Sequence, residues 1–318
     1  MAIVLVIAVR RSGVSFRFRP NFKHPAVRQL LRLSLWTFGY VVANQIALVV
    51  IKNLAEPGSG NVDAYSKAMI LLQLPHGLLA VSIATTFIPD LARLAARNDS
   101  VGFSQRMTNG IRLTAMLTFP AAVGLLVLSR PIIGIVLQHG NFSAIAGVNT
   151  GRALTGLSLG LIGFSLYLFV LRGFYSRNDT RTPFFINLGE NALNIVLAFV
   201  LVGRYGVLGL GLAFSLAYII SALVALFVLS RKIPEFSFTA ALGSLWSICL
   251  ATGLMAAIVA ISTSFVGSNA GSGALLKVTI GVVVGCVSYW LLLKLFKVEE
   301  LRNFSVRNTA KSSVDKNN

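Results

Sequence analysis

Charged residues are scarce in this sequence, and acidic residues are the scarcest. Only 12% of the 318 residues are charged, and 28 Lys and Arg stand against 10 Asp and Glu, which gives a net charge of +18. A soluble domain carries roughly 25% charged residues. With 55% hydrophobic residues and a mean hydropathy of +0.78, the composition indicates a membrane protein.

Residues that support metal, redox or nucleotide chemistry are equally few. Cys249 and Cys286 lie alone inside apolar runs, and the three histidines fall in different segments without a carboxylate at ligand spacing. Such spacing predicts neither a disulfide nor a metal site. The sequence has no P-loop and so predicts no ATP hydrolysis by this chain. We expect no cofactor and no metal.

One sequence pattern that is found in enzymes does occur. Residues 156–160 read GLSLG and match GxSxG. In hydrolases this pattern forms a strand–turn–helix elbow, whereas here it lies inside an apolar run. Glycines at i and i+4 on a membrane helix are typical of a face on which another helix packs closely. We interpret Gly156 and Gly160 in that way and expect that the chain is not an enzyme.

Eight apolar runs, separated by Gly, Pro and basic residues, make up most of the chain. Each has about 18–24 residues, enough for a helix to cross the roughly 30 Å hydrocarbon core. Backbone groups in lipid find no water, so such runs must be helical. The sequence predicts an all-α, polytopic membrane protein with spans over 30–51, 69–88, 111–128, 154–171, 184–202, 207–229, 242–265 and 274–296.

The two ends of the chain differ from the spans. Residues 1–9 are apolar but too short to cross a membrane, and we interpret them as the end of a helix whose first half the chain lacks. Residues 10–32 carry seven basic and no acidic side chains, which predicts an anchor to anionic lipid headgroups. Residues 298–318 are polar and predict a disordered tail.

The basic residues alternate between successive connections. One set of connections, together with both chain ends, holds 22 Lys and Arg, and the other set holds 6. This asymmetry predicts that both termini are cytoplasmic. It also accounts for the positive charge without nucleic acid as a partner, because the sequence has no zinc spacing, RNA-binding aromatic motif or basic helical face.

Polar residues inside the spans are the candidates for function, because they are costly in lipid and normally face the bundle interior or a wet cavity. Asn187, Asn191 and Asn194 share one helical face at i, i+4 and i+7, and Glu190 borders it. This stripe favours a cavity wall over scattered hydrogen bonds, and hence a secondary carrier. The predicted pathway residues are Asn44, Gln45, Lys67, Gln73, Arg172, Arg177, Arg181, Asn187, Glu190, Asn191 and Asn194.

Several local patterns stand out between about residues 27 and 232. They are PGSGNVDAYSKA at 57–68, QLPHGLLAVSIATTFIP at 73–89, FPA at 119–121, QHGNF at 138–142, GFYSRNDTRTP at 173–183 and the glycine-spaced helix start at 206–211. In order and spacing they resemble the MurJ/MviN family of lipid II flippases. The last two spans resemble the family only in position and hydrophobicity.

The resemblance implies a fold and a function. Members of the family have two six-helix lobes and two further helices, and they move the lipid-linked cell-wall precursor outward across the bacterial cytoplasmic membrane by alternating access. The chain would comprise a helix stump and basic loop (1–29), the second lobe (30–232), the two additional helices (233–297) and a cytoplasmic tail (298–318). Its expected partners are the lipid-linked precursor, membrane lipids and a first lobe that it lacks.

Two departures affect the site that the resemblance implies. Many members carry an arginine where this chain has Ile70, and some carry an acidic residue where it has Gln73. In members with a sodium site, an Asn is followed one turn later by Asn or Asp. Asn194 matches the first position, but the second is Ala198, and the corresponding position of the first span is Ile51. The sequence therefore predicts an incomplete sodium site.

Two alternatives stay open on the sequence. An exporter of another lipid-linked oligosaccharide, or a drug–cation antiporter, would have similar spans and a similar polar stripe. A non-transporting membrane scaffold is an alternative of a different class, because half a carrier need not carry anything.

Overall fold

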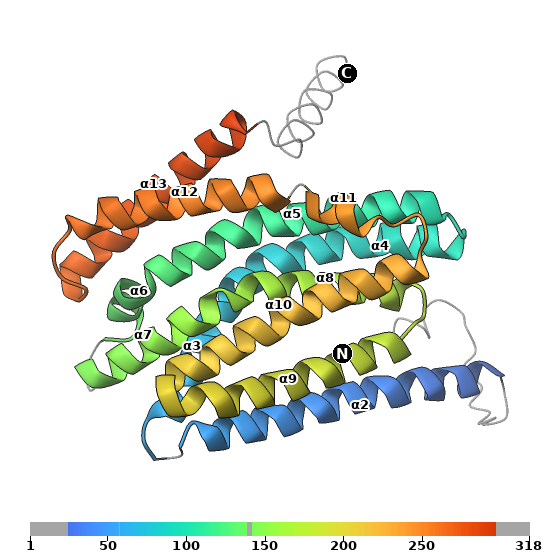
Figure 1. Ribbon diagram of the computed structural model, residues 1–318, viewed down its shortest axis with the longest axis horizontal. Coiled ribbons are helices and arrows are strands. Elements are labelled where there is room, and N and C mark those ends of the chain that lie inside the picture. The colour runs from blue at the N-terminus through green and yellow to red at the C-terminus, as the bar shows by residue number, and fades with distance from the viewer. Residues whose placement is uncertain (1–24, 57, 139–141, 244, 297–318) are drawn as a thin grey trace, which may run out of the picture.

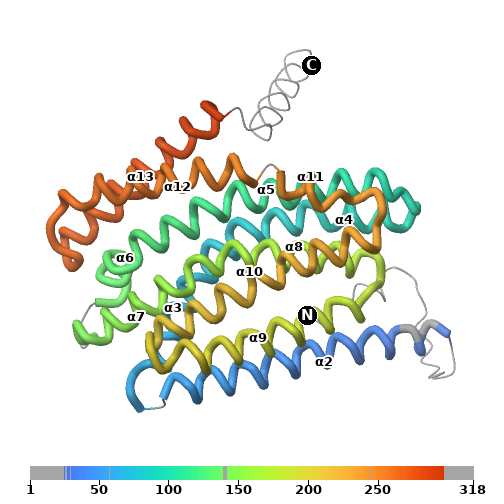
Figure 2. The backbone as a smooth tube through the Cα atoms, viewed as in Figure 1, coloured from blue at the N-terminus to red at the C-terminus, as the bar shows by residue number. Residues whose placement is uncertain are grey.

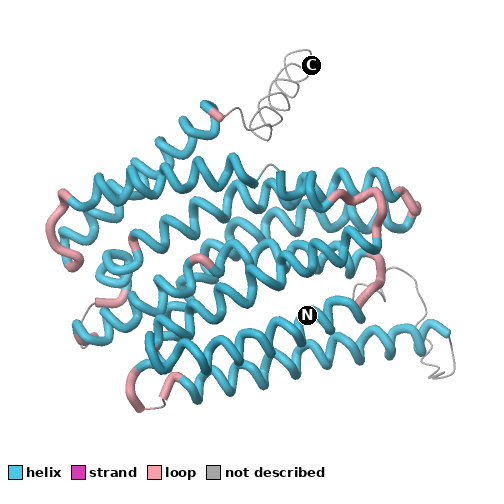
Figure 3. The backbone as a smooth tube through the Cα atoms, viewed as in Figure 1, coloured by secondary structure: helices cyan, strands magenta, loops and turns pink. Residues whose placement is uncertain are grey.

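The structure is a computed structural model that describes residues 25–296 except 57, 139–141 and 244. The predicted stump at 1–9, the basic segment up to residue 24 and the predicted tail at 298–318 lie outside the described residues. Within the described ranges the chain forms helices joined by turns, without a strand (Figure 3).

The helices lie side by side as an elongated bundle (Figures 1 and 2). In chain order they are α2 (Pro25–Leu54), α3 (Asn61–Pro75), η1 (His76–Val81), α4 (Ser82–Ala96), α5 (Ser100–Val127), α6 (Ser129–Val136), α7 (Ala144–Ser158), α8 (Gly160–Ser176), α9 (Arg181–Tyr205), α10 (Val207–Lys232), α11 (Phe238–Gly243), α12 (Leu245–Ser264) and α13 (Gly271–Leu295). In the described part of the chain, seven spans are long and apolar enough to cross a membrane, and the bent pair α7–α8 makes an eighth. The eight predicted runs are confirmed.

The chain runs back and forth between the two ends of this bundle. The connections α2–α3, α6–α7, α9–α10 and α12–α13 lie at one end, and α4–α5, α8–α9 and α10–α11 lie at the other (Figure 1). The second end carries the connections that are rich in Lys and Arg. The charge asymmetry of the sequence therefore separates the two ends of the folded bundle.

The second span is longer than the predicted run over 69–88. The helices α3, η1 and α4 form one span over Asn61–Ala96. Pro75 has no N–H and ends the α-helical part, and a π-helix over His76–Val81 takes up the altered hydrogen bonding. His76 is buried in this segment, with its Nδ1 3.0 Å from the Oγ of Ser165 on α8.

The fourth span, which the sequence predicts over 154–171, is bent. It divides at Leu159 into α7 and α8, which meet at 47°. The close packing predicted for the glycines is present, because a Cβ on Gly160 would lie 2.8 Å from the Phe214 ring of α10. The Ser215 hydroxyl of α10 donates to the Gly156 carbonyl at 2.6 Å.

α10 is the centre of the bundle and packs on α7, α8 and α9. Lipid covers apolar side chains as well as another helix does, so membrane helices associate through close contact and hydrogen bonds. Further helices lie on both sides of this centre (Figure 1). On one side α2 packs against α9, and on the other α12 and α13 pack against α5 and α6. On this second side, the Tyr289 hydroxyl donates to the Met116 carbonyl at 2.7 Å.

Candidate functional site

The polar stripe of α9 faces the interior of the bundle. Asn187, Glu190, Asn191 and Asn194 are 0%, 1%, 6% and 6% exposed, while Leu188 between them is 46% exposed. The 3.6-residue period of the helix places the four polar side chains on one side, as the sequence predicts. The buried side of α9 is thus its polar side, which is the arrangement of a membrane helix that lines a wet interior.

α2 supplies a partner for this stripe. The Nδ2 of Asn44 donates to the Oδ1 of Asn187 at 3.3 Å, and the Nδ2 of Asn191 lies 3.5 Å from the Oδ1 of Asn44. Asn191 Nδ2 also donates to the carbonyl of Asn187 at 2.9 Å. Such bonds between membrane helices contribute about 0.6 kcal/mol each, so they align α2 with α9 without locking the two helices together.

A cavity of about 290 Å³ lies beside the stripe, between α2, α3, α9 and α10. Its polar lining consists of Asn44, Glu190, Asn191 and Asn194 together with residues of the other walls. Both carboxylate oxygens of Glu190 and the Oδ1 of Asn194 are buried without a hydrogen-bond partner among the described residues. These unsatisfied acceptors can bind a hydrogen-bond donor or a cation in this part of the cavity.

The cavity also has residues that the sequence analysis did not select. Lys52 of α2, Tyr65 and Ser66 of α3, and Tyr218 of α10 line it. A tyrosine in an apolar run gives no signal, because its ring is apolar and only its hydroxyl is polar. Lys52 had a usable signal: it lies eight residues after Asn44 and so on the same face of α2.

Two of the predicted pathway residues lie away from the cavity. Gln45 on α2 and Gln73 on α3 are exposed. Gln45 follows Asn44 by one residue, and the 100° rotation per residue turns it away from α9. Ile70, the position at which many family members carry an arginine, does line the cavity, so this chain has an apolar side chain at that point of the wall.

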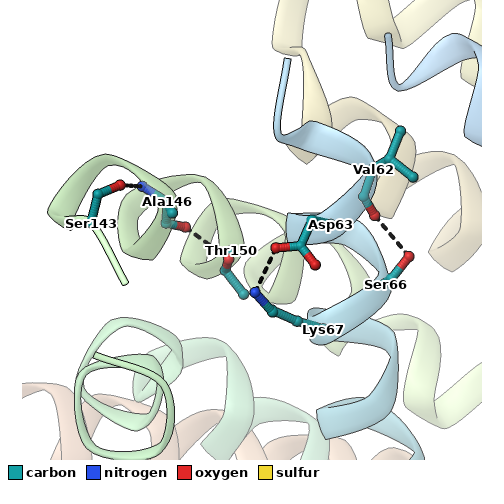
Figure 4. Close-up of polar contacts among 7 residues, drawn as sticks. All are labelled: Val62, Asp63, Ser66, Lys67, Ser143, Ala146 and Thr150. Atoms are coloured by element: carbon teal, nitrogen blue, oxygen red, sulfur yellow. Dashed lines mark hydrogen bonds and ion pairs between the residues drawn. The ribbon is translucent and has the colours of Figure 1, made fainter. Parts of the chain in front are cut away.

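Lys67 is paired and does not line the cavity. Its Nζ lies 2.5 Å from the Oδ2 of Asp63 and 4.6 Å from the centre of the Phe142 ring. Figure 4 shows the pair on α3 with Thr150 of α7 beside it. The charge of Lys67 therefore lies outside the cavity, in an ion pair with Asp63.

The three predicted arginines lie at the end of the bundle that is rich in basic residues. Arg172, Arg177 and Arg181 are exposed, and none of them lines the cavity. The Arg177 guanidinium lies 5.6 Å from the centre of the Phe103 ring, and that of Arg181 lies 5.8 Å from the Trp36 ring. These stacked positions suit anchoring at a membrane surface.

Asp179 holds the α8–α9 connection. Its Oδ1 accepts the Thr182 N–H at 3.0 Å, and its Oδ2 accepts the Thr182 hydroxyl at 2.7 Å and the Lys232 ammonium at 2.6 Å. Partial burial opposes ionisation of this carboxyl, but the bonds from Lys232 and Thr182 outweigh it and hold the pKa of Asp179 below its ordinary value. The start of α9 is thereby tied to the end of α10.

Asp179→Asn is expected to lower the free energy of unfolding by about 1 kcal/mol, because it removes an ion pair and weakens the acceptor at the start of α9. The pKa of Asp179 is lower in the folded than in the unfolded chain. Its stabilisation is therefore present above the unfolded pKa and is lost as the pH falls through the folded one. Thermal unfolding in detergent should separate wild type and variant at neutral pH and bring them together in strong acid.

The matched control for this prediction is Asp63→Asn, which breaks the exposed pair with Lys67 on the opposite end of the bundle. An exposed pair of this kind contributes little, so its removal should leave the unfolding temperature nearly unchanged. A difference between Asp179→Asn and wild type that stays the same at every pH would contradict the assignment of the Asp179 carboxylate.

Two of the three sodium-site positions named by the resemblance carry no side-chain oxygen in this chain. Ile51 lines the cavity with an apolar side chain, and Ala198 is fully buried. Across the residues that the structure describes, no group of three or more His, Cys, Asp or Glu side chains is placed to hold a metal ion. Asn194 is the one of the three positions that keeps an oxygen ligand.

Comparison with known proteins identifies the family. The profile of the family described as lipid II flippase MurJ matches residues 1–299. The chain belongs to the MurJ family. A probable lipid II flippase MurJ of Rhizobium meliloti is 35% identical over 225 residues, which cover 70% of this chain and 42% of that protein. One of Thermotoga maritima is 29% identical over 298 residues, which cover 92% of this chain and 58% of that protein.

The fold is also that of a MurJ structure. A lipid II flippase MurJ solved in an inward closed conformation matches with a TM-score of 0.68 and 27% identity, over 92% of this chain and 60% of that chain. The family match includes the last two spans, for which the sequence patterns were weak. The chain is thus a multi-pass membrane protein of this family, and it spans about 42–60% of the length of these relatives.

Proposed function

We propose that this chain forms the second lobe and the last two helices of a lipid II flippase, which moves the lipid-linked peptidoglycan precursor outward across the bacterial cytoplasmic membrane. The observation that carries the proposal is the cavity beside the polar stripe of α9, in a chain of the MurJ family. A lipid-linked glycan has a polar headgroup and an apolar tail, so its carrier needs hydrogen-bonding groups inside the bundle and apolar surface outside it.

In this proposal the headgroup moves along the cavity wall. The amides of Asn44, Asn191 and Asn194 line this wall and can donate and accept hydrogen bonds, which suits sugar hydroxyls and peptide groups, while the fully buried Asn187 holds Asn44 in place. Lys52 adds a cation that suits a phosphate. Gln45, Gln73, Lys67 and the basic residues Arg172, Arg177 and Arg181 then serve at the lipid-facing surface and at the two ends of the bundle.

The small volume of the cavity supports alternating access as the mechanism. Its volume of about 290 Å³ is at the lower limit of ligand pockets, which measure roughly 300–1,000 Å³. A disaccharide that carries a peptide needs a larger space, so the cavity must open toward one side and then the other. Residues 30–232 would move as a lobe while 233–297 accompany it, a division that stays a prediction.

The proposal also fixes the orientation and a partner. We assign the bundle end with the α4–α5, α8–α9 and α10–α11 connections to the cytoplasm, because Lys and Arg are retained on that side. Both termini are then cytoplasmic. The relatives are longer than this chain, and the part that this chain does not match would supply the first lobe.

The test of this function uses cells depleted of their own flippase. The chain is expressed alone and together with the part of the Thermotoga maritima relative that it does not match. A membrane-impermeant reagent that cleaves the headgroup then measures the fraction of lipid II on the outer leaflet. We expect exposure to be restored at least in the combined cells. Correct membrane insertion without restored exposure in either arrangement would contradict the proposal.

Neighbouring residues on α2 test the pathway itself. Asn44→Ala is expected to reduce outer-leaflet exposure several-fold, because it removes the α2 side of the Asn44–Asn187 contact and a polar group of the cavity. Gln45→Ala, one residue later but exposed, is expected to leave exposure unchanged. The same assay measures both variants, and equal effects would show that the cavity is not the route.

A further inference from the structure

Glu190 is a buried acidic side chain to which the proposed path of the headgroup gives no role. It lies near the middle of α9 with 1% of its surface exposed, and it lines the cavity. Neither of its carboxylate oxygens has a hydrogen-bond partner among the described residues. An ionised carboxylate in this position gives up its hydration without gaining a bond, which is strongly unfavourable.

The groups around Glu190 do not balance a negative charge. α9 packs against α2, α8 and α10, and α3 completes the cavity. The titratable or charged residues that face Glu190 from these helices are Tyr40, Lys52, Tyr65, Tyr167 and Tyr218. The tyrosines carry no positive charge. Lys52 is a cation, but it is exposed and forms no ion pair with Glu190 in the described structure.

Asn194, one turn further along α9, also lacks a hydrogen-bond partner for one side-chain atom, because its Oδ1 is buried and has no donor among the described residues. Because Asn194 follows Glu190 by four residues, the two side chains are neighbours on one face of α9. As long as Glu190 is ionised, this face presents three buried acceptor oxygens and no donor to them. One proton on the carboxyl group turns one of these oxygens into a donor, and the Asn194 Oδ1 lies on the adjacent turn to accept it.

We propose that Glu190 is a proton-binding site of the cavity and that the closed cavity holds its protonated form. The carboxylate takes one proton from water on the side to which the cavity is open, which converts COO⁻ to COOH. The carboxyl O–H then donates to Asn194 as the cavity closes. When the cavity opens again, water solvates the side chain and the proton leaves. Carboxylates inside membrane bundles serve as proton relays in carriers.

This inference rests on the proposed function only where it links the proton to transport, since proton binding is a property of the cavity itself. The test therefore uses no lipid II. Infrared spectra of the full chain in a detergent without ester groups are recorded at neutral pH, where the carbonyl-stretch band of a protonated carboxyl group is separate from the bands of carboxylates. Because the chain has only 10 Asp and Glu, a single protonated carboxyl is resolvable.

We expect one such band in wild type, its loss in Glu190→Gln, and its retention in Glu235→Gln, a variant of an exposed glutamate at the α10–α11 connection. The band should disappear reversibly as the pH is raised. Its absence from wild type, as expected for a carboxylate kept ionised by cavity water, would overturn the proposal. So would its presence in Glu190→Gln. Circular dichroism of each variant checks that the helices are intact.

Two further arms identify the bound species and its partner. Asn194→Leu removes the acceptor and should move the Glu190 band to the higher frequency of a less strongly bonded carboxyl, and an unchanged frequency would overturn the assignment of Asn194. Sodium chloride is added at constant pH against choline chloride of the same concentration. The band should not respond. Its loss in sodium alone would mean that a metal cation, not a proton, is the ligand of Glu190.

Discussion

Replacing Glu190 with Gln is expected to slow the outward movement of lipid II by at least about tenfold, which corresponds to about 1.4 kcal/mol in the limiting barrier. Gln has nearly the shape of protonated Glu and fits the same 1% exposed position on α9. It can neither take up nor release a proton, so the cavity loses the change of charge that favours reopening to water. Membrane insertion should be intact, because a neutral amide is no more costly in lipid than the carboxyl group.

The measurement is the rate at which lipid II reaches the outer leaflet, in cells whose own flippase is depleted and at several external pH values. The wild-type rate should vary with pH, and the Glu190→Gln rate should be low and constant. Glu235→Gln removes the same charge from an exposed position and should behave as wild type. A normal, pH-dependent rate in a correctly inserted Glu190→Gln variant would show that Glu190 serves packing alone.

The polar stripe is the part of the site that the sequence could predict. The positions of Asn187, Glu190, Asn191 and Asn194 relative to one another follow from the helical period, which is a local property. The residues that face this stripe come from distant parts of the sequence. The hydrogen bond between Asn44 and Asn187 joins residues 143 positions apart, and it depends on the rotation and sliding of α2 against α9. The sequence alone could therefore not distinguish Asn44 from its neighbour Gln45.

Charge was a better guide to the ends of the bundle than to the roles of individual residues. The count of Lys and Arg predicted which connections share an end, and the arrangement of the helices agrees with it (Figure 1). The count treats every cation alike, however. It does not show that Lys67 is neutralised by Asp63 or that Arg181 lies over Trp36. These outcomes depend on which side chain an element from another part of the chain brings within reach.

The irregular parts of the helices also show what the sequence could not predict. Pro75 lies inside the predicted second span, and the fold accommodates it with a π-helix over His76–Val81 that the sequence did not predict. Gly156 and Gly160 were interpreted as a packing face, and they do pack on α10. The 47° bend at Leu159 between them was not predicted, because it results from fitting two helical halves against one central helix.

The second large effect is expected at Gly211, where the backbones of α10 and α7 approach each other closely. A Cβ on Gly211 would lie 2.8 Å from the carbonyl carbon of Gly156 and 2.8 Å from the amide nitrogen of Leu157. Gly211→Leu should lower the free energy of unfolding by about 3 kcal/mol, at the upper end of the usual cost of an overpacked side chain. Heating or denaturant titration of the purified chain in detergent measures the loss.

The matched control is Gly189→Leu on α9, because a Cβ there meets nothing within 4 Å and Gly189 is exposed. Replacing Gly in a helix gains up to about 1 kcal/mol in propensity, so this variant should be as stable as wild type or more stable.

The neighbours of Gly211 are backbone atoms and cannot rotate away, so α7 and α10 must separate. Separation would break the Ser215–Gly156 bond of 2.6 Å. It would also move Phe214 and Tyr218 of the cavity wall, so transport should fail together with stability. Equal stability of the two variants would mean that the contact between α7 and α10 does not fix the position of that wall.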